Sequence, residues 1–351
     1  MRPMVAERLV LVHDGIHSFL EANPVFAATQ CKTIGEGAAV IDADGRVTLL
    51  ASPAWDATRL REESGIEVIG CDDVAARLAE LLAGCNRVEV AGLDDVPVRY
   101  CEALTAVVSE LLTASSDTSR PKTDRELAGA RQAAAIAEDA YAALLDRVRP
   151  SIREHELVAR LDVDVRRRGA DDHFVLVSSS PEGDNVRAPT GRELAHGDVV
   201  NIEISPAVDG QFIQTCRTAV LGNASRSRRR AYALLVEALA EGTAAASHGS
   251  TVAEVVAALD APLIAAGLSE YCRPPHIRVR GHGQGLASVA PGDITWDNQT
   301  RLESGMMFTL HPNQRFPDSG YMLCGEPVLV TRNGGVPLTR RPPGLDEVAC
   351  F

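Results

Sequence analysis

Four short segments of the chain carry residue types that can ligate a metal ion or transfer protons. Glu203 follows the run Gly-Asp-Val-Val-Asn-Ile, and Gln214 stands eleven positions later with a glycine between them. Two adjacent antiparallel strands joined by a tight return can place side chains 203 and 214 beside each other. His282 lies between two glycines, which let other groups approach its ring closely. His311 follows the run Gly-Met-Met-Phe-Thr-Leu, and Glu326 begins the last apolar segment.

The order and spacing of these segments resemble the pita-bread superfamily of methionine aminopeptidases, proline dipeptidases, aminopeptidase P and creatinase. The resemblance covers roughly residues 122–340. Metal-binding members place Asp, Asp, His, Glu and Glu around two cations. The resemblance puts these five metal-ligand positions on Glu203, Gln214, His282, His311 and Glu326. Glu203 is a conservative change, whereas Gln214 is neutral and His311 replaces a carboxylate that also helps to activate water in the peptidases.

Two further histidines of the family are replaced here by Val186 and Val289. In the peptidases these histidines contact the substrate, and the first is also the catalytic base of creatinase. Their loss argues against both standard peptidase and standard creatinase chemistry. Arg187 stands beside the first of these positions and can bind a substrate carboxylate bidentately. We therefore predict Arg187 and Gln214 as substrate-binding residues.

The charges at the five positions limit which metal centre they can hold. Only Glu203 and Glu326 are anionic, and two carboxylates balance one divalent cation well but two cations poorly. A pair of metal ions is therefore disfavoured. Two alternatives stay open: one divalent ion, for which Fe, Zn or Mn suits the ligands, or no metal and a polar pocket.

The resemblance implies a hydrolase, and we expect it to cleave a C–N bond in a small, nitrogen-containing metabolite. The predicted catalytic residues are His311, Glu326, Glu203 and His282. His311 would serve as a general base or a ligand, because an unperturbed imidazole titrates near neutrality. Two alternatives use the same scaffold: a metal-dependent lyase, which the superfamily also contains, and a catalytically inactive binding module.

The elements that must position these side chains form an α+β domain over residues 122–351, for which the resemblance implies the pita-bread fold. Thr123 and Glu126 form a capping-box signature that opens a helix ending before Pro150. The remaining patterns predict helices over 154–168, 226–246 and 252–266, and strands over 174–178, 198–205, 212–220, 306–310 and 326–331.

Residues 1–117 form a smaller α/β domain that resembles, more loosely, the companion domain of creatinases and proline peptidases. The patterns predict a helix over 7–21, a hairpin of strands 38–41 and 47–50, a helix over 73–83 and a strand over 88–90. The polar stretch 113–121 ends in proline and is typical of a linker.

Composition restricts the partners and the compartment. The formal net charge of −13 repels nucleic-acid phosphates and anionic lipid, so we expect neither nucleic acid nor a membrane as partner. The eight cysteines contain no CxxC pair, and no apolar run reaches membrane-spanning length. We expect a cytoplasmic protein that binds a small-molecule substrate and, by analogy with the family, forms a homodimer.

Overall fold

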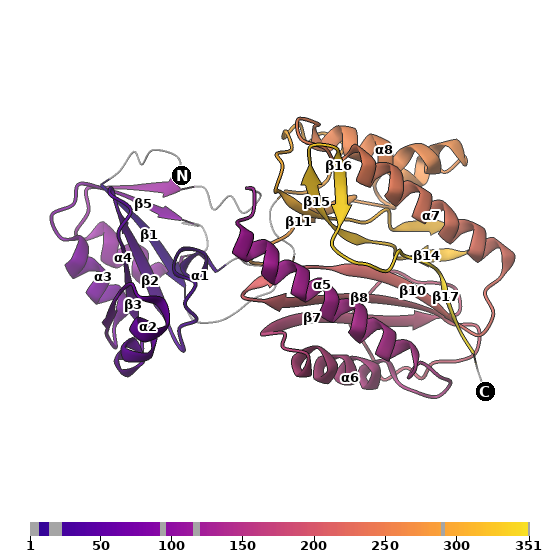
Figure 1. Cartoon of the computed structure of the whole chain (residues 1–351), viewed down its shortest axis with the longest axis horizontal. Helices are drawn as coiled ribbons and strands as arrows, with labels where there is room; N and C mark the ends of the chain where they lie inside the picture. The colour runs from indigo at the N-terminus through magenta and orange to yellow at the C-terminus, as the bar shows by residue number, and fades with distance from the viewer. Residues whose placement is uncertain (1–6, 14–22, 92–95, 115–119, 289–291, 350–351) are drawn as a thin grey trace. The chain divides into compact units, whose positions relative to one another are not determined.

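The chain divides into two compact units, Met1–Asp117 and Thr118–Phe351, and each is described by itself (Figure 1). The computed structural model describes residues 7–13, 23–91, 96–114, 120–288 and 292–349. No helix in this part of the chain is both long and apolar enough to cross a lipid bilayer.

The first unit is built on one six-stranded sheet with the order β4-β3-β2-β1-β5-β6. Its strands are β1 Arg8–His13, β2 Gly37–Asp42, β3 Val47–Ala51, β4 Glu67–Gly70, β5 Arg87–Ala91 and β6 Glu110–Ala114. The β2–β3 hairpin was predicted, and the structure confirms it with an antiparallel register. The predicted strand over 88–90 is likewise confirmed as β5.

Helices cover both faces of this sheet. They are α1 Pro24–Thr29, the 3₁₀ turn Ala54–Asp56, α2 Ala57–Ser64, α3 Val74–Leu82 and α4 Val98–Thr105. Val10 and Val12 pack in one apolar cluster with α3 and α4, whereas Leu11 packs in the other with α1 and α2. The predicted helix over 7–21 is wrong at its start, because successive residues there pack on opposite faces of the sheet, as in a strand. Residues 8–13 are buried by strand partners distant in sequence, and residues 14–22 lie outside the described residues.

The second unit contains two larger sheets and one two-stranded ribbon. The first sheet has the order β17-β10-β8-β7, with β9 paired to β8, and the second has the order β11-β12-β15-β16. The first comprises β7 Asp172–Ser180, β8 Val199–Val208, β9 Gln211–Phe212, β10 Thr215–Leu221 and β17 Asp346–Val348. The second comprises β11 Gly281–Gly283, β12 Met307–Leu310, β15 Glu326–Thr331 and β16 Gly334–Pro337; β13 Gln314–Phe316 pairs with β14 Gly320–Met322.

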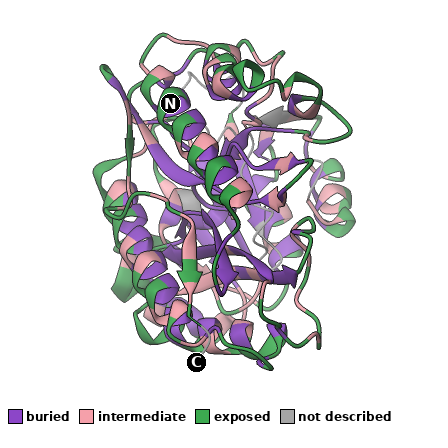
Figure 2. Ribbon diagram, turned by 90° about the vertical axis from the view of Figure 1, so that its right-hand side faces the viewer, coloured by how far each residue is buried: buried purple, intermediate pink, exposed green. Residues whose placement is uncertain are grey.

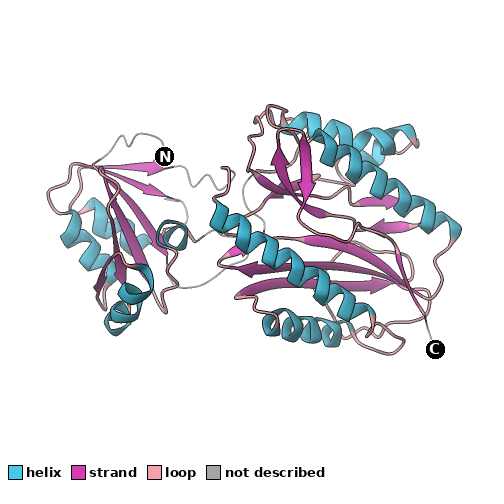
Figure 3. Cartoon of the chain, in the orientation of Figure 1, coloured by secondary structure: helices cyan, strands magenta, loops and turns pink. Residues whose placement is uncertain are grey.

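Two pairs of helices cover these sheets from outside (Figure 3). They are α5 Asp124–Leu145, α6 Glu154–Arg167, α7 Arg226–Ala245 and α8 Val252–Ala265, with a 3₁₀ turn at Ser269–Cys272. The predicted capping box opens α5: the Thr123 amide donates to Glu126 Oε2 at 2.8 Å, and the Glu126 amide donates to Thr123 Oγ1 at 3.3 Å. Figure 2 shows the strands buried and the outward helix faces exposed.

The apolar residues of each sheet point toward its own helices. Val200, Ile202 and Ile204 of β8 lie in one cluster with α5 and α6, and Phe308 and Leu310 of β12 lie in the other with α7 and α8. Because successive strand residues point to opposite faces, the intervening residues of β8 face away from α5 and α6. That face carries the candidate site.

Candidate active site

Glu203 and Cys216 lie directly opposite each other on neighbouring strands. The β8–β10 register pairs these two residues, and Cys216 Sγ lies 3.9 Å from Glu203 Oε1. Both side chains point away from the helix-facing residues Ile202 and Ile204. Gln214 lies two residues before Cys216, so the spacing of eleven brings Gln214 to the same region as Glu203. The hairpin predicted from the sequence is therefore the one that the structure forms.

Burial changes the chemistry of the Glu203 carboxyl. The side chain is only partly exposed, and burial raises its pKa to about 7, while the Cys216 thiol acts weakly in the opposite direction. Burial also raises the pKa of the Cys216 thiol well above its ordinary value, with the Glu203 charge adding to the effect. Cys216 is thus a neutral thiol, and Glu203 can hold or release a proton near neutral pH.

His282 connects β11 to the first sheet. Its ring is 5% exposed, with Nδ1 2.9 Å from the Gly283 carbonyl and Nε2 3.0 Å from Gln214 Oε1. Burial lowers the pKa of His282. The structure therefore brings together His282 and Gln214, two of the five predicted metal-ligand positions.

His311 lies directly after β12, beside His282. The two ring centroids are 5.5 Å apart, and the ring planes are tilted by 58°. Burial, together with a smaller effect of the neighbouring His282, lowers the pKa of His311 to about 3. Its Nδ1 is buried and has no hydrogen-bond partner among the residues that the structure describes. His311 therefore carries an unused polar atom, which an incoming ligand can pair.

Glu326 does not join this group, contrary to the prediction. Its carboxylate is bound by the Arg217 guanidinium and the Thr339 hydroxyl, and its side chain is 2% exposed. A Cβ placed on Gly325 would lie 2.9 Å from His311 Cβ and 3.0 Å from Cys216 Cβ. Gly325 is thus the residue of this segment that faces the site.

The physical reason is the alternation of side chains along a strand. Residues 325 and 326 point to opposite faces, as do Cys216 and Arg217. One face brings Gly325 to Cys216 and His311, and the other brings Glu326 to Arg217. Burial raises the pKa of the Glu326 carboxyl although Arg217 lies against it. Glu326 is therefore a structural ion-pair partner of Arg217. Gly325, which faces the site, has no side chain that could ligate a metal ion.

Arg187, predicted to bind substrate, forms an ion pair with Glu154 instead. Its guanidinium donates to both carboxylate oxygens of Glu154, at 2.7 and 2.8 Å. Glu154 is fully buried and also accepts hydrogen bonds from Ser179 and Thr190. The predicted substrate contact of Arg187 is therefore replaced by an ion pair that ties a loop to α6. Of the two lost family histidines, Val186 lies in this loop and Val289 lies outside the described residues.

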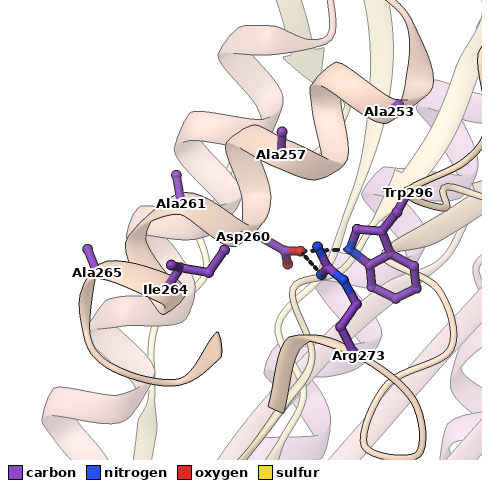
Figure 4. Close-up of a pocket in the computed structure, with 8 residues that line it drawn as sticks. All are labelled: Ala253, Ala257, Asp260, Ala261, Ile264, Ala265, Arg273 and Trp296. Carbon is purple, nitrogen blue, oxygen red and sulfur yellow. Dashed lines mark hydrogen bonds and ion pairs between the residues drawn. The ribbon is translucent and has the colours of Figure 1, made fainter. Parts of the chain in front are cut away.

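A fully buried arginine holds the two histidine segments in place. Arg280 precedes β11 and donates from Nε to Asp260 Oδ1 at 2.7 Å and from Nη1 to the Asn313 carbonyl at 3.0 Å. Its own carbonyl accepts the amide of His311 at 3.0 Å. Figure 4 shows the outer side of this network, where Asp260 also binds Arg273 and the Trp296 indole N–H.

The donors at the site do not fit a two-metal centre. Gly325 offers no ligand, Glu326 is held by Arg217, and Gln214 is neutral, so Glu203 is the only carboxylate left from the predicted set. Two dications beside one carboxylate would carry a large uncompensated charge. Over the described ranges, no group of three or more His, Cys, Asp or Glu side chains lies close enough together to hold a metal ion.

Two buried glutamines near the site were not predicted from the sequence. Gln211 and Gln284 are almost completely buried, and Gln284 lies two residues after His282. Their amide groups have no hydrogen-bond partner among the described residues. The only sequence signal was the polar residue inside the otherwise glycine-rich run Gly-His-Gly-Gln-Gly. Nothing local to Gln211 distinguishes it from a solvated residue at a turn.

Comparisons with known proteins find a family match and structural relatives. Residues 128–336, more than half of the chain, match metallopeptidase family M24. The chain is 27% identical over 231 residues to the uncharacterized peptidase YqhT of Bacillus subtilis, over 64% of this chain and 63% of that protein. It is 27% identical over 224 residues to the Xaa-Pro dipeptidase of Pyrococcus furiosus, over 62% and 63% respectively. The matched region therefore spans less than two thirds of the length of these relatives.

Solved structures resemble the chain over almost its whole length. The prolidase from Pyrococcus furiosus superposes with a TM-score of 0.84 at 22% identity, covering 96% of this chain and 97% of that one. The X-Pro aminopeptidase from Thermotoga maritima gives 0.82 at 17% identity, covering 97% of both. These likenesses confirm the predicted fold, a pita-bread domain preceded by a smaller creatinase-like α/β domain.

Proposed function

The chain belongs to metallopeptidase family M24, and from that premise we propose that it hydrolyses a C–N bond in a small nitrogen-containing metabolite without a bound metal ion. The proposal is supported by a chain of contacts: Glu203 lies beside Cys216, His282 contacts Gln214, and His311 lies beside His282. Gly325 is next to both His311 and Cys216. The family cleaves C–N bonds, as the name of the Xaa-Pro dipeptidase relative indicates.

The proposed reaction uses Glu203 as the proton carrier. Its carboxylate takes a proton from water as the water oxygen bonds to the carbonyl carbon of the substrate. The proton then passes to the substrate nitrogen as the C–N bond breaks, which gives a free amine and an acid. Only one carboxylate is required for both transfers, since the same group acts first as base and then as acid.

The two histidines act as neutral groups in this proposal. The unpaired His311 Nδ1, in its protonated tautomer, donates a hydrogen bond to the carbonyl oxygen as that oxygen becomes negative. His282 holds the Gln214 side chain in position through the 3.0 Å contact between Nε2 and Oε1. A neutral imidazole suits a donor role because it need not lose a charge during the reaction.

The test combines metal analysis with activity. Protein purified without chelator is analysed for metal, and hydrolysis of Xaa-Pro dipeptides and of N-acyl and N-carbamoyl amino acids is measured with and without chelator. We expect substoichiometric metal, no Xaa-Pro dipeptidase activity and chelator-resistant hydrolysis of an N-substituted amino acid. Glu203→Gln should lower kcat by about 10²- to 10⁴-fold. The exposed Glu241 of α7 supplies the matched control, Glu241→Gln.

Three results would overturn the proposal. Stoichiometric metal that disappears in His311→Ala would establish a one-ion centre instead. Metal-dependent cleavage of Xaa-Pro dipeptides would show that the family's peptidase reaction survives without the usual ligands. Wild-type rates in Glu203→Gln would remove this residue from the reaction.

A further inference from the structure

Two glutamine side chains beside the histidines are buried without hydrogen-bond partners. Gln284 is completely buried and Gln211 is 1% exposed. In the described part of the chain, neither the amide oxygen nor the amide nitrogen of either residue has a partner. Buried polar groups in folded proteins are almost always paired, with protein or with ordered water. Two such amides on adjoining segments indicate a position that another molecule fills.

Gln284 and Thr309 continue the face that carries His282. The Gln284 amide donates to the Met307 carbonyl at 3.2 Å, which extends the β11–β12 ladder past Gly283. Residues two apart on a strand share a face, so Gln284 follows His282 on the same side. Thr309 stands opposite His282 in the register, and its buried hydroxyl is also unpaired among the described residues.

Gln211 belongs to the first sheet and lies beside Gly285, the residue that follows Gln284. The amide of the next residue, Phe212, donates to the Gly285 carbonyl at 2.6 Å. A Cβ placed on Gly285 would lie 3.8 Å from Gln211 Oε1 and 2.9 Å from Lys122 Nζ. Gln211 therefore borders the residue that follows Gln284, and a side chain at position 285 would intrude between Gln211 and Lys122.

We propose that the amide cluster, defined as Gln211, Gln284 and Thr309, binds a carboxamide or ureido group of the substrate. This inference rests on the proposed hydrolase function and names its substrate class. A primary amide offers one hydrogen-bond acceptor and two donors. Two such amides therefore pair best with a ligand group that carries both donors and acceptors. A carboxylate has no donor and an ammonium group has no acceptor.

The test compares two probes that differ in one group. N-carbamoylglycine carries a terminal NH2 where N-acetylglycine carries a methyl group, and the two are otherwise matched in size and charge. Binding of each is measured by isothermal titration calorimetry to the wild-type protein and to Gln211→Leu and Gln284→Leu. Gln132→Leu, at an exposed glutamine of α5, is the control. Glu203→Gln is included so that binding can be followed without turnover.

We expect the wild-type protein and Gln132→Leu to bind N-carbamoylglycine at least about tenfold more tightly than N-acetylglycine, because one unmatched polar pair is worth about that ratio. The preference should fall below about threefold in Gln211→Leu and Gln284→Leu. Equal affinity for the two probes, no binding of either, or an unchanged preference in both leucine variants would overturn the inference. Selective binding without hydrolysis would refute the proposed reaction and leave the binding site standing.

Discussion

Replacing Glu326 with glutamine should destabilise the second unit strongly, because it leaves a buried arginine without its counter-charge. The Arg217 and Glu326 side chains are 5% and 2% exposed. Removing one partner of a buried ion pair typically costs about 3–5 kcal/mol. Arg217 keeps its hydrogen bonds to the carbonyls of Gly325, at 2.7 Å, and Cys216, at 3.0 Å. We therefore expect the lower end of that range, about 3 kcal/mol.

The double variant Arg217→Met with Glu326→Leu should recover most of this loss. Well-packed apolar residues often replace a buried ion pair at little cost, so we expect it within about 1 kcal/mol of the wild-type protein. Glu203→Gln serves as the comparison. Glu203 forms no ion pair with any described residue, so neutralising it should change stability by less than about 1 kcal/mol.

Urea unfolding measures these differences by tryptophan fluorescence. The chain has two tryptophans, Trp55 in the first unit and Trp296 in the second. A Trp55→Phe background leaves Trp296 as the reporter of the unit that contains Glu326, and the free energy is obtained by linear extrapolation. The reasoning is refuted if Glu326→Gln costs less than about 1 kcal/mol, or if Glu203→Gln costs as much.

Three further outcomes follow from single contacts. Burial opposes ionisation of Glu154, but hydrogen bonds led by Arg187 lower its pKa to about 2 from an ordinary 4.5. Its contribution of about 3 kcal/mol should be intact above pH 4.5 and lost toward pH 2, so Glu154→Gln should flatten the acid limb of stability measured by urea unfolding. Gly325→Ala should cost about 1–3 kcal/mol in the same assay, whereas Gly344→Ala, with open space around it, should be neutral. Gln284→Leu should melt at or above the wild-type temperature, because it removes unpaired polar atoms from the interior; a lower melting temperature would show that the amide is paired in the folded protein.

Local signals in the sequence were sufficient for much of the fold. The capping box of Thr123 and Glu126 opens α5 as predicted, because its hydrogen bonds join residues only three positions apart. The β2–β3 hairpin follows from alternation on both sides of an Asp-Gly turn. The strand Arg8–His13 could not be recognised in the same way. Its partners begin 24 or more positions later in the chain, so a helical pattern in the local sequence was misleading.

The sequence by itself indicated the family and four residues of the candidate site. The signals around Glu203, Gln214, His282 and His311 are local ones. They consist of a hairpin pattern and of nearby glycines, which can be recognised in short stretches of sequence. From these residues alone it followed that carboxylates are too few for two cations.

Only the tertiary structure decided which residues face the site. Whether Gly325 or Glu326 points toward His311 depends on a single step of strand alternation, and that step is set by pairing with residues about a hundred positions earlier, at Cys216 and Arg217. The partner of Arg187 is likewise 33 positions away in sequence. Burial depends on the packing of distant elements, and burial is what brings the pKa of Glu203 near neutrality and keeps His311 uncharged.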